Sequence, residues 1–289
     1  RVADAGIIPT LSSSMDFKSG STASTQYFYD TNGSMTKDLN KGISNISYNF
    51  LNLPQSLTIS NSLGSAINTY VYAADGKKLS VTRNSFKTDY AGNVIYENGA
   101  FKRLLVDGGY YENGTYYFYI QDHLGNNRIV TNQNGGVVQS TQYYPFGMSF
   151  TDDMTQSTQP YKYSGKELDS DKGLNWYDYS ARYTDVTLGN RFTTMDPLAE
   201  KYYGVSPYGY CLNNPIKFID RDGRKVYFAP GMSDEFKTSF RTAVKHLNKH
   251  NASAMLAKLH ESNQIYYITE GENNSRFFLA TRTIEWDPY

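Results

Sequence analysis

A tyrosine followed by a turn signal recurs along the first 115 residues of the chain. The recurring tyrosines are separated by 19, 24, 18 and 20 residues, and they are Tyr29, Tyr48, Tyr72, Tyr90 and Tyr110. Turn-forming pairs follow them, such as Asn32-Gly33 and Asp75-Gly76. A unit of roughly twenty residues with one such turn has the length of a two-stranded hairpin. Because an isolated hairpin is marginally stable, we expect neighbouring hairpins to pair into one curved antiparallel sheet over residues 20–150.

The composition favours a mainly β protein and gives no support to several functional classes. The chain has 289 residues, and its 27 tyrosines, 15 phenylalanines and 23 glycines suit pleated strands and tight turns. Lys plus Arg and Asp plus Glu both total 28, so no net charge would draw the protein to nucleic acid or to an anionic membrane. No apolar run reaches the ~20 residues of a membrane span. The single Cys211 excludes an internal disulfide.

Two of the three expected segments precede position 225. Residues 1–115 carry the hairpin repeat, and residues 116–224 hold denser motifs. In the second segment we expect a strand over Val137–Tyr144 and short helices at Leu198–Tyr202 and Pro207–Asn213. The chain opens within strand-like sequence, without an initiator Met or a signal peptide, so we expect it to be a piece of a longer protein.

The third segment, residues 225–289, has the pattern of a small α+β unit. Ser233 stands as the N-cap of a helical stretch that we expect from Asp234 to His260. Strands are expected over Gln264–Glu270 and Arg276–Trp286, paired across the sequence GENNS.

Six motifs in the second segment carry a family resemblance: DHLGNNR, YYPFG, YSGKELD, GLNWYDYSARY, MDPLAEKY and NNPIKFIDRDGR. Together with the tyrosine–turn repeats, they resemble the Rhs/YD-repeat family and its RHS repeat-associated core. The resemblance covers roughly residues 20–224. It implies a hollow β shell of YD repeats, a core region that plugs one end, and a variable C-terminal toxin inside. Such a protein would encapsulate and deliver a toxin in competition between bacteria or against a host.

The same resemblance implies partners and a location. The partners would be components of a secretion system or toxin complex and a cognate immunity protein. The protein would be exported, either secreted or displayed at the cell surface. A partial shell would also leave an open sheet edge, through which copies could associate by strand pairing. The alternative is a cell-surface adhesion module whose exposed tyrosines bind carbohydrate.

The resemblance further implies that the core cleaves its own chain after the second of two aspartate motifs. By their places in the motifs, Arg182 would be the catalytic arginine and Asp196 the first aspartate, while Asp220 and Asp222 would form the second motif. Two carboxyl groups held together share a proton, so one can act as the acid and the other as the base on a peptide bond. A nearby arginine can hold the ionised carboxylate or the developing oxyanion.

The sequence departs from the family pattern at both aspartate motifs. Asp196 is followed by Pro-Leu-Ala without a glycine, and Arg221 stands where the family usually has proline. Losing that proline frees φ and restores an N–H, which would relax the turn that presents the expected scissile bond, Arg224–Lys225. The alternative is that the two motifs only form turns and N-caps that close the last β layer.

The end of the chain has a weaker resemblance. The sequence IEWDP at residues 284–288 resembles the strand that leads into the His-Glu-x-x-His zinc helix of some C-terminal toxins. That helix would lie beyond Tyr289, so zinc is expected only there, and no cofactor is expected in the present chain. From position 225 onward 8 basic residues face 7 acidic ones, which gives little support to a nuclease toxin.

Aromatic residues are dense between positions 160 and 224, where turn sequences such as NNP and SPY also occur. We expect this region to fold back against the end of the sheet as a compact plug. The plug should bury Trp176, Tyr179, Phe192 and Phe218.

Overall fold

The protein is mainly β, as the sequence predicts. The computed structural model describes residue 17, residues 19–151, 159–201 and 204–249, and three strands at 267–270, 277–278 and 283–286. Most of these residues lie in strands or in the turns between them, and one α-helix occurs in these ranges.

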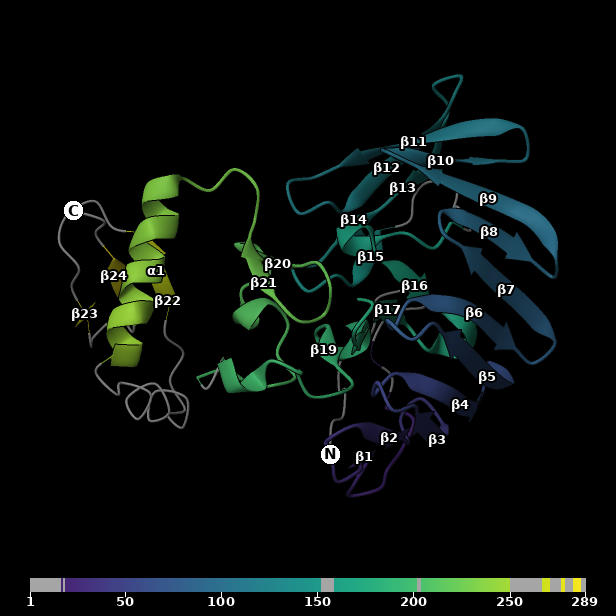
Figure 1. Ribbon diagram of the computed structural model, residues 1–289, viewed down its shortest axis with the longest axis horizontal. Helices are drawn as coiled ribbons and strands as arrows, with labels where there is room; N and C mark the ends of the chain where they lie inside the picture. Colours follow the sequence, from purple (N-terminus) through teal and green to yellow (C-terminus); the bar gives the residue numbers. More distant parts are fainter. Residues whose placement is uncertain are drawn as a thin grey trace.

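Thirteen strands form a single antiparallel sheet in which neighbours in sequence are also neighbours in space. Figure 1 shows this sheet curling from β1 and β2 round to β11 and β12. The strands are β1 (Tyr27–Tyr29), β2 (Met35–Asp38), β3 (Ile43–Tyr48), β4 (Pro54–Asn61), β5 (Gly64–Tyr72), β6 (Lys78–Arg83), β7 (Phe86–Ala91), β8 (Val94–Glu97), β9 (Ala100–Val106), β10 (Gly109–Glu112), β11 (Thr115–Gln121), β12 (Asn127–Asn132) and β13 (Val137–Ser140). The predicted continuous sheet of consecutive hairpins is confirmed.

Side-chain alternation and turn residues explain why the sequence forms this sheet. Along β5, Tyr70 is 5% exposed whereas the next residue, Val71, is 53% exposed, so only one face of the strand meets the core. Four asparagines in the connecting turns have positive φ, and they are Asn52, Asn84, Asn98 and Asn113. Asparagine tolerates this left-handed region better than most residues, which suits the tight turns between antiparallel strands.

The strand predicted over Val137–Tyr144 is wrong as a single element. β13 ends at Ser140, and Gln142–Tyr143 forms a separate strand, β14, which pairs with β15 (Ser149–Thr151). At the break, the backbone N–H of the buried Thr141 still donates to the carbonyl of Arg128 at 2.8 Å. The chain leaves the sheet after this bond because the tyrosine of β14 is buried in the core of the next unit.

The two short helices predicted before position 224 are reduced to single 3-10 turns. The first is η4 (Ala199–Lys201), inside the predicted Leu198–Tyr202, of which Tyr202 lies outside the described residues. The second is η5 (Cys211–Asn213), at the end of the predicted Pro207–Asn213. All three residues of η5 have positive φ, between 48° and 59°, so a right-handed helix cannot pass through them.

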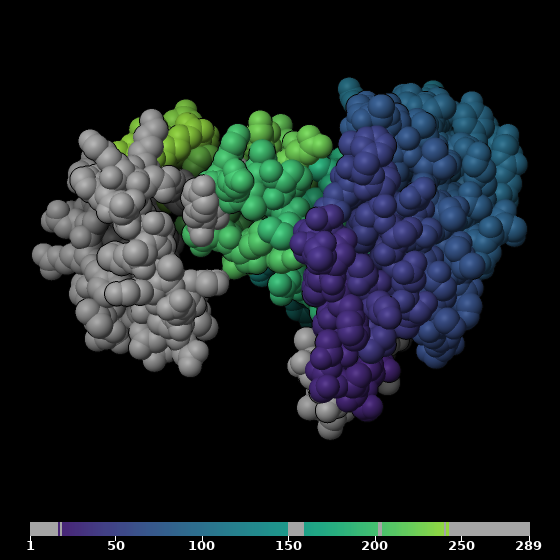
Figure 2. Space-filling view, turned by 60° about the horizontal axis from the view of Figure 1, so that its bottom comes forward, coloured from purple at the N-terminus to yellow at the C-terminus, as the bar shows by residue number. Residues whose placement is uncertain are grey.

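Residues 159–220 form the plug that the aromatic density predicts. Its centre is a four-stranded antiparallel sheet of β16 (Glu167–Asp169), β17 (Trp176–Asp178), β18 (Tyr183–Asp185) and β19 (Arg191–Phe192). A 3-10 turn, η1 (Tyr163–Gly165), precedes β16, and two others, η2 (Asp171–Gly173) and η3 (Val186–Leu188), connect β16 to β17 and β18 to β19. Trp176, Tyr179, Phe192 and Phe218 are each at most 7% exposed, so their predicted burial is confirmed. In Figure 2 the plug, in green, lies against the purple and blue wall of the large sheet.

Buried ion pairs join the large sheet to the plug. The ammonium of Lys78 on β6 lies 2.8 Å from a carboxylate oxygen of Glu167 and 2.7 Å from one of Asp178. The hydroxyl of Tyr90 on β7 donates to the second oxygen of Glu167 at 2.5 Å. These side chains are 15% exposed or less in the ion pairs, so solvent screens them weakly.

At this interface, one surface carries the positive charges and the other carries the negative charges. Two further ion pairs connect the same surfaces. Nη2 of Arg83 lies 2.8 Å from Oδ2 of Asp169, and Nζ of Lys41 lies 2.7 Å from Oδ2 of Asp185. In these pairs the cations all come from the large sheet and the turns that join its strands, and the carboxylates all come from the plug. Burying a charge is favourable only beside a well-placed partner, so these contacts define one seating of the plug on the sheet.

The last strand of the plug, β20 (Phe218–Asp220), pairs antiparallel with β21 (Val226–Phe228), the first strand of the C-terminal segment. The helix α1 (Asp234–Lys249) follows. The Oγ of Ser233 accepts the N–H of Phe236 at 3.1 Å, which confirms the predicted N-cap. The part of the predicted helix after Lys249 lies outside the described residues.

The pairing predicted for the last strands is wrong. β22 (Tyr267–Glu270) runs parallel to β24 (Thr283–Trp286), and β23 (Phe277–Phe278) takes the antiparallel place beside β24. The twelve residues between β22 and β24 are long enough for the crossover that parallel strands need, whereas a hairpin turn would have placed the two strands antiparallel.

Replacing Lys78 with methionine should destabilise the protein by about 3–5 kcal/mol, because the buried carboxylates of Glu167 and Asp178 lose the cation between them. The matched control is Lys87→Met, since Lys87 pairs with Asp89 on the surface, where the side chains are 51% and 35% exposed. That control should cost at most about 1 kcal/mol. Urea unfolding of both variants measures the difference, and equal losses would contradict the structural role of the Lys78 pairs.

Candidate functional site

The turn between β20 and β21 is built by two aspartate side chains. The Oδ1 of Asp220 accepts the backbone N–H of Asp222 at 3.1 Å and that of Gly223 at 2.7 Å. The Oδ1 of Asp222 accepts the N–H of Arg224 and of Lys225, both at 3.0 Å. Four successive backbone donors are therefore satisfied by carboxylates, which explains the alternating aspartates of the sequence DRDGRK.

Arg182 lies against this turn and joins it to the first aspartate motif. Its Nη2 lies 2.8 Å from Oδ2 of Asp196 and 3.8 Å from Oδ2 of Asp220. Its Nε donates to the backbone carbonyl of Gly223, and its Nη1 donates to the carbonyl of Pro207 at 3.0 Å. Arg182 is 3% exposed. One buried guanidinium therefore binds both predicted motifs and a backbone carbonyl of the turn.

The ring of Phe192 stacks against the guanidinium of Arg182, whose guanidinium carbon lies 3.5 Å from the ring centroid. Arg182 lies in the short connection after β17 and directly precedes β18, so its position is set by the central strands of the plug. A flat guanidinium stacked on an aromatic ring loses little freedom when it forms its hydrogen bonds.

Burial shifts the pKa values of two groups at this site, Asp220 and Arg182, in opposite directions. Burial raises the pKa of Asp220 above its usual value, against the opposing effects of its bond to the Gly223 N–H and of Arg182. Burial also lowers the pKa of Arg182, and the charges of Asp196 and Asp220 oppose that shift. The Oδ2 of Asp220 is buried and makes no hydrogen bond within the described part of the protein. A carboxyl group with a raised pKa and an oxygen not committed to the turn can carry a proton.

The structure brings together three of the predicted site residues, Arg182, Asp196 and Asp220. Asp222 lies in the same turn, but its carboxylate binds backbone N–H groups and shapes the turn. The carbonyl that Arg182 holds belongs to Gly223, one residue before the predicted Arg224–Lys225 bond. A catalytic role for these residues stays a prediction.

Arg221 replaces the expected proline without opening the turn. Its guanidinium carbon lies 5.4 Å from the ring centroid of the exposed Tyr227, so the side chain is on the outside of the turn. The backbone on either side is held by the carboxylates of Asp220 and Asp222. The predicted relaxation of this turn is therefore opposed by hydrogen bonds that the sequence motif itself supplies.

Sequence reasoning assigned no role to two contacts that also hold this turn. The N–H of Ala181 donates to the carbonyl of Asp222 at 3.2 Å, and Nζ of Lys166 donates to the carbonyl of Arg221 at 2.6 Å. Lys166 belongs to the motif YSGKELD, but its distance of 55 residues from Arg221 gives no sequence signal of contact.

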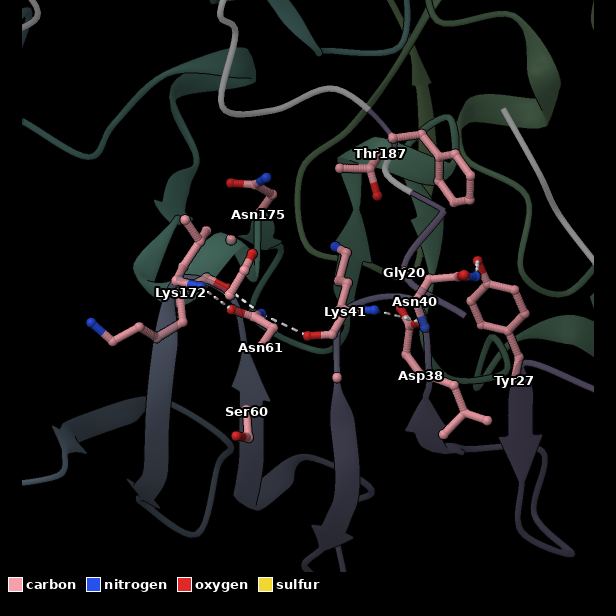
Figure 3. Close-up of a pocket in the computed structure, with 16 residues that line it drawn as sticks. Gly20, Tyr27, Asp38, Asn40, Lys41, Ser60, Asn61, Lys172, Asn175 and Thr187 are labelled. Carbon is pink, nitrogen blue, oxygen red and sulfur yellow. Dashed lines mark hydrogen bonds between the residues drawn. The ribbon is translucent and has the colours of Figure 1, made fainter. Parts of the chain in front are cut away.

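A cavity of about 400 Å³ lies elsewhere, between the ends of β2 to β5 and the plug (Figure 3). Its lining includes Tyr27, Asp38, Lys41, Asn61 and Lys172. The ammonium of Lys41 is already paired with a plug carboxylate, and Asn61 donates to backbone carbonyls on both sides of the cavity. Arg182, Asp196 and Asp220 are not part of this lining.

The described residues contain neither a candidate metal site nor a membrane-spanning helix. Within the described residues, no three His, Cys, Asp or Glu side chains are grouped so that they could hold a metal ion. In the same part of the chain, no helix combines the length and the apolar character needed to cross a membrane.

Sequence comparison identifies relatives that are much longer than this chain. No protein-family model matches the chain. Salivary gland surface protein 1 of Aedes aegypti is 38% identical over 118 residues, which are 40% of this chain and 3% of that protein. The tRNA3(Ser)-specific nuclease WapA of Bacillus spizizenii is 28% identical over 178 residues, which are 55% of this chain and 8% of that protein.

Solved structures share the fold. The crystal structure of TcdB2-TccC3 matches 68% of this chain and 11% of its own chain, with a TM-score of 0.56 and 20% sequence identity. The Photorhabdus luminescens Tc holotoxin pore with a mutation in TccC3 matches 71% of this chain and 11% of its own, with a TM-score of 0.55 and 18% identity. The curved sheet with its plug is therefore an architecture found in toxin-complex structures.

Replacing Gly223 with alanine should destabilise the turn by about 2–4 kcal/mol. Its φ is +72°, and an added Cβ would lie 3.0 Å from both the backbone nitrogen of Arg182 and the carbonyl oxygen of Tyr179. The matched control is Gly92→Ala, where φ is +69° but nothing lies within 4 Å of the added Cβ. The control should cost about 1 kcal/mol, from backbone strain alone. Thermal unfolding compares the two, and equal costs would show that the turn does not press against the plug.

Proposed function

We propose that this chain is a part of an Rhs-type toxin protein, in which a β shell encapsulates and delivers the segment that follows it. The observation that carries the proposal is the curved thirteen-stranded sheet with its ion-paired plug, together with its likeness to TccC3-containing structures and the sequence relationship to WapA. A sheet that curves around a plug provides an enclosed surface, and the buried charges hold the plug in place.

The proposal divides the chain into a shell segment over 1–115, a core region over 116–224 that includes the plug as well as β12 and β13, and the beginning of a toxin over 225–289. The protein would be exported, with components of a secretion system or toxin complex as partners and an immunity protein that protects the producing cell. Copies could also associate by strand pairing at β1, which pairs with β2 alone among the described strands.

The proposal includes self-cleavage within the turn between β20 and β21. In this mechanism a water molecule attacks a peptide carbonyl of the turn, and the carboxylate of Asp196 accepts the proton from that water. The Arg182 guanidinium, which touches both Asp196 and the turn, stabilises the oxyanion. Asp220, whose pKa is raised by burial, is the group that gives a proton to the leaving nitrogen in this mechanism. The C–N bond breaks to leave one carboxylate and one amine.

A specific observation favours the second candidate, a carbohydrate-binding adhesion module. Four aromatic side chains form a row across β8 to β11, with ring centroids 6.3 Å apart between Tyr96 and Phe101, 6.4 Å between Phe101 and Tyr111, and 4.9 Å between Tyr111 and Tyr116. Phe101 and Tyr116 are each 48% exposed. Aromatic faces in a row can stack on sugar rings, and binding to a glycan array that is lost in Tyr116→Ala would support this function.

Replacing Asp196 with asparagine should prevent self-cleavage. The purified wild-type chain should give two bands on a denaturing gel, and the variant should give one, because an amide cannot act as a general base. The expected loss in rate is about a hundredfold or more.

The matched control for this test is Asp75→Asn. Asp75 lies in a hairpin turn of the large sheet, where its Oδ1 accepts the N–H of Lys77 at 3.0 Å. This variant changes a turn aspartate in the same way but leaves the Arg182 cluster untouched, so it should be cleaved like the wild type. A folded wild-type chain that stays intact, or an Asp196→Asn chain that is still cut, would exclude the proposed cleavage.

A further inference from the structure

Three successive carbonyl groups of the turn between β20 and β21 are held by donors of the plug. The carbonyl of Arg221 accepts Nζ of Lys166 at 2.6 Å, and that of Asp222 accepts the N–H of Ala181 at 3.2 Å. The carbonyl of Gly223 accepts Nε of Arg182. The turn is therefore bound along its backbone, as a peptide substrate would be. Lys166 is the one of these donors that brings a charge and has no role in the mechanism above.

The backbone of Lys166 is fixed by the plug. Its N–H donates to the carbonyl of Tyr163 at 2.9 Å, and its carbonyl accepts the N–H of Lys162 at 2.9 Å. Its ammonium lies 5.3 Å from the ring centroid of the buried Tyr179. A rigid base and an aromatic neighbour restrict a side chain that is otherwise flexible, so Lys166 is preorganised to meet the turn.

The charge of Lys166 faces the carboxylates of the site. Within the described residues it makes no ion pair, unlike Lys78, which is bound to two carboxylates at the other side of the plug. Burial lowers the pKa of Lys166, while the negative charges of Asp178 on β17 and of Asp220 and Asp222 in the turn oppose that shift. By reciprocity, the ammonium favours the ionised forms of Asp178 and Asp220.

We propose that Lys166 is a positioning residue for the self-cleavage. This inference rests on the proposed function. It holds the carbonyl of Arg221 so that the next residues of the turn stay against Arg182. Its positive charge also affects the pH range in which Asp220 keeps the proton that it gives to the leaving nitrogen. A lysine that only stabilised the plug would do neither, because its loss would change unfolding without changing the pH dependence of the cleavage rate.

The test measures the rate of self-cleavage of the full chain, made by cell-free translation and followed on denaturing gels from pH 5 to pH 9. Lys166→Met should slow cleavage about tenfold to a hundredfold, because one charge-assisted hydrogen bond is lost. The alkaline side of its pH profile should move up by about one pH unit, since Asp220, which has to carry a proton as the acid, ionises at higher pH without a nearby cation. Lys166→Arg keeps the charge and the donors, so it should restore most of the rate.

Lys162→Met is the matched control, because the ammonium of Lys162 donates to Gln139 at 2.7 Å and not to the turn. It should cleave like the wild type with an unchanged pH profile. Thermal unfolding of each chain in the Asp196→Asn background shows whether the lysine variants fold. If Lys166→Met does not fold, the pH profile of Lys166→Gln replaces it as the deciding measurement.

Two outcomes overturn the inference in different ways. A wild-type chain that cleaves, with a folded Lys166→Met chain that cleaves at the same rate and pH, excludes the positioning role and leaves the proposed function standing. A wild-type chain that folds and never cleaves excludes self-cleavage itself, and the role of Lys166 falls with it.

Discussion

The ion pairs between the large sheet and the plug are the interaction on which the rest of the structure depends. The plug carries Glu167, Asp169, Asp178 and Asp185 on the strands that face the sheet, and their charges could not be buried without cations. The sheet supplies those cations from β6 and from the turn between β2 and β3. Apolar contacts alone would allow the plug to pack on the sheet in several positions. Opposite charges at fixed strand positions allow only one of these positions.

The position of the plug determines the geometry of the candidate site. Arg182 lies between β17 and β18, the same two strands whose ends carry Asp178 and Asp185. Because the ion pairs fix the position of these strands, they also fix the position of the Arg182 guanidinium beside the turn after Asp220. The turn itself is shaped by its own aspartates, and Gly223 allows its backbone to approach Arg182 closely. Packing of the plug and shape of the turn are thus two separate requirements for one site.

Local patterns in the sequence predicted the elements that depend on local rules. The tyrosine–turn repeat predicted the sheet, and Ser233 predicted the start of α1, because hairpins and N-caps are decided within a few residues. The break at Thr141 and the parallel pairing of β22 and β24 were missed, since both depend on contacts between distant segments. For the site, motif resemblance named Arg182, Asp196 and Asp220, which the structure places together. Lys166 carried no signal, because only the folded plug brings it to Arg221.

The central claim is that the chain cuts itself within the turn between β20 and β21. The most direct measurement is the first-order rate of cleavage of the freshly made full chain over a hundredfold range of dilution, with the new N-terminus identified by mass spectrometry. The account predicts one rate constant at all concentrations and a new terminus between Asp222 and Lys225. A rate that falls with dilution, or a terminus outside this turn, would contradict it.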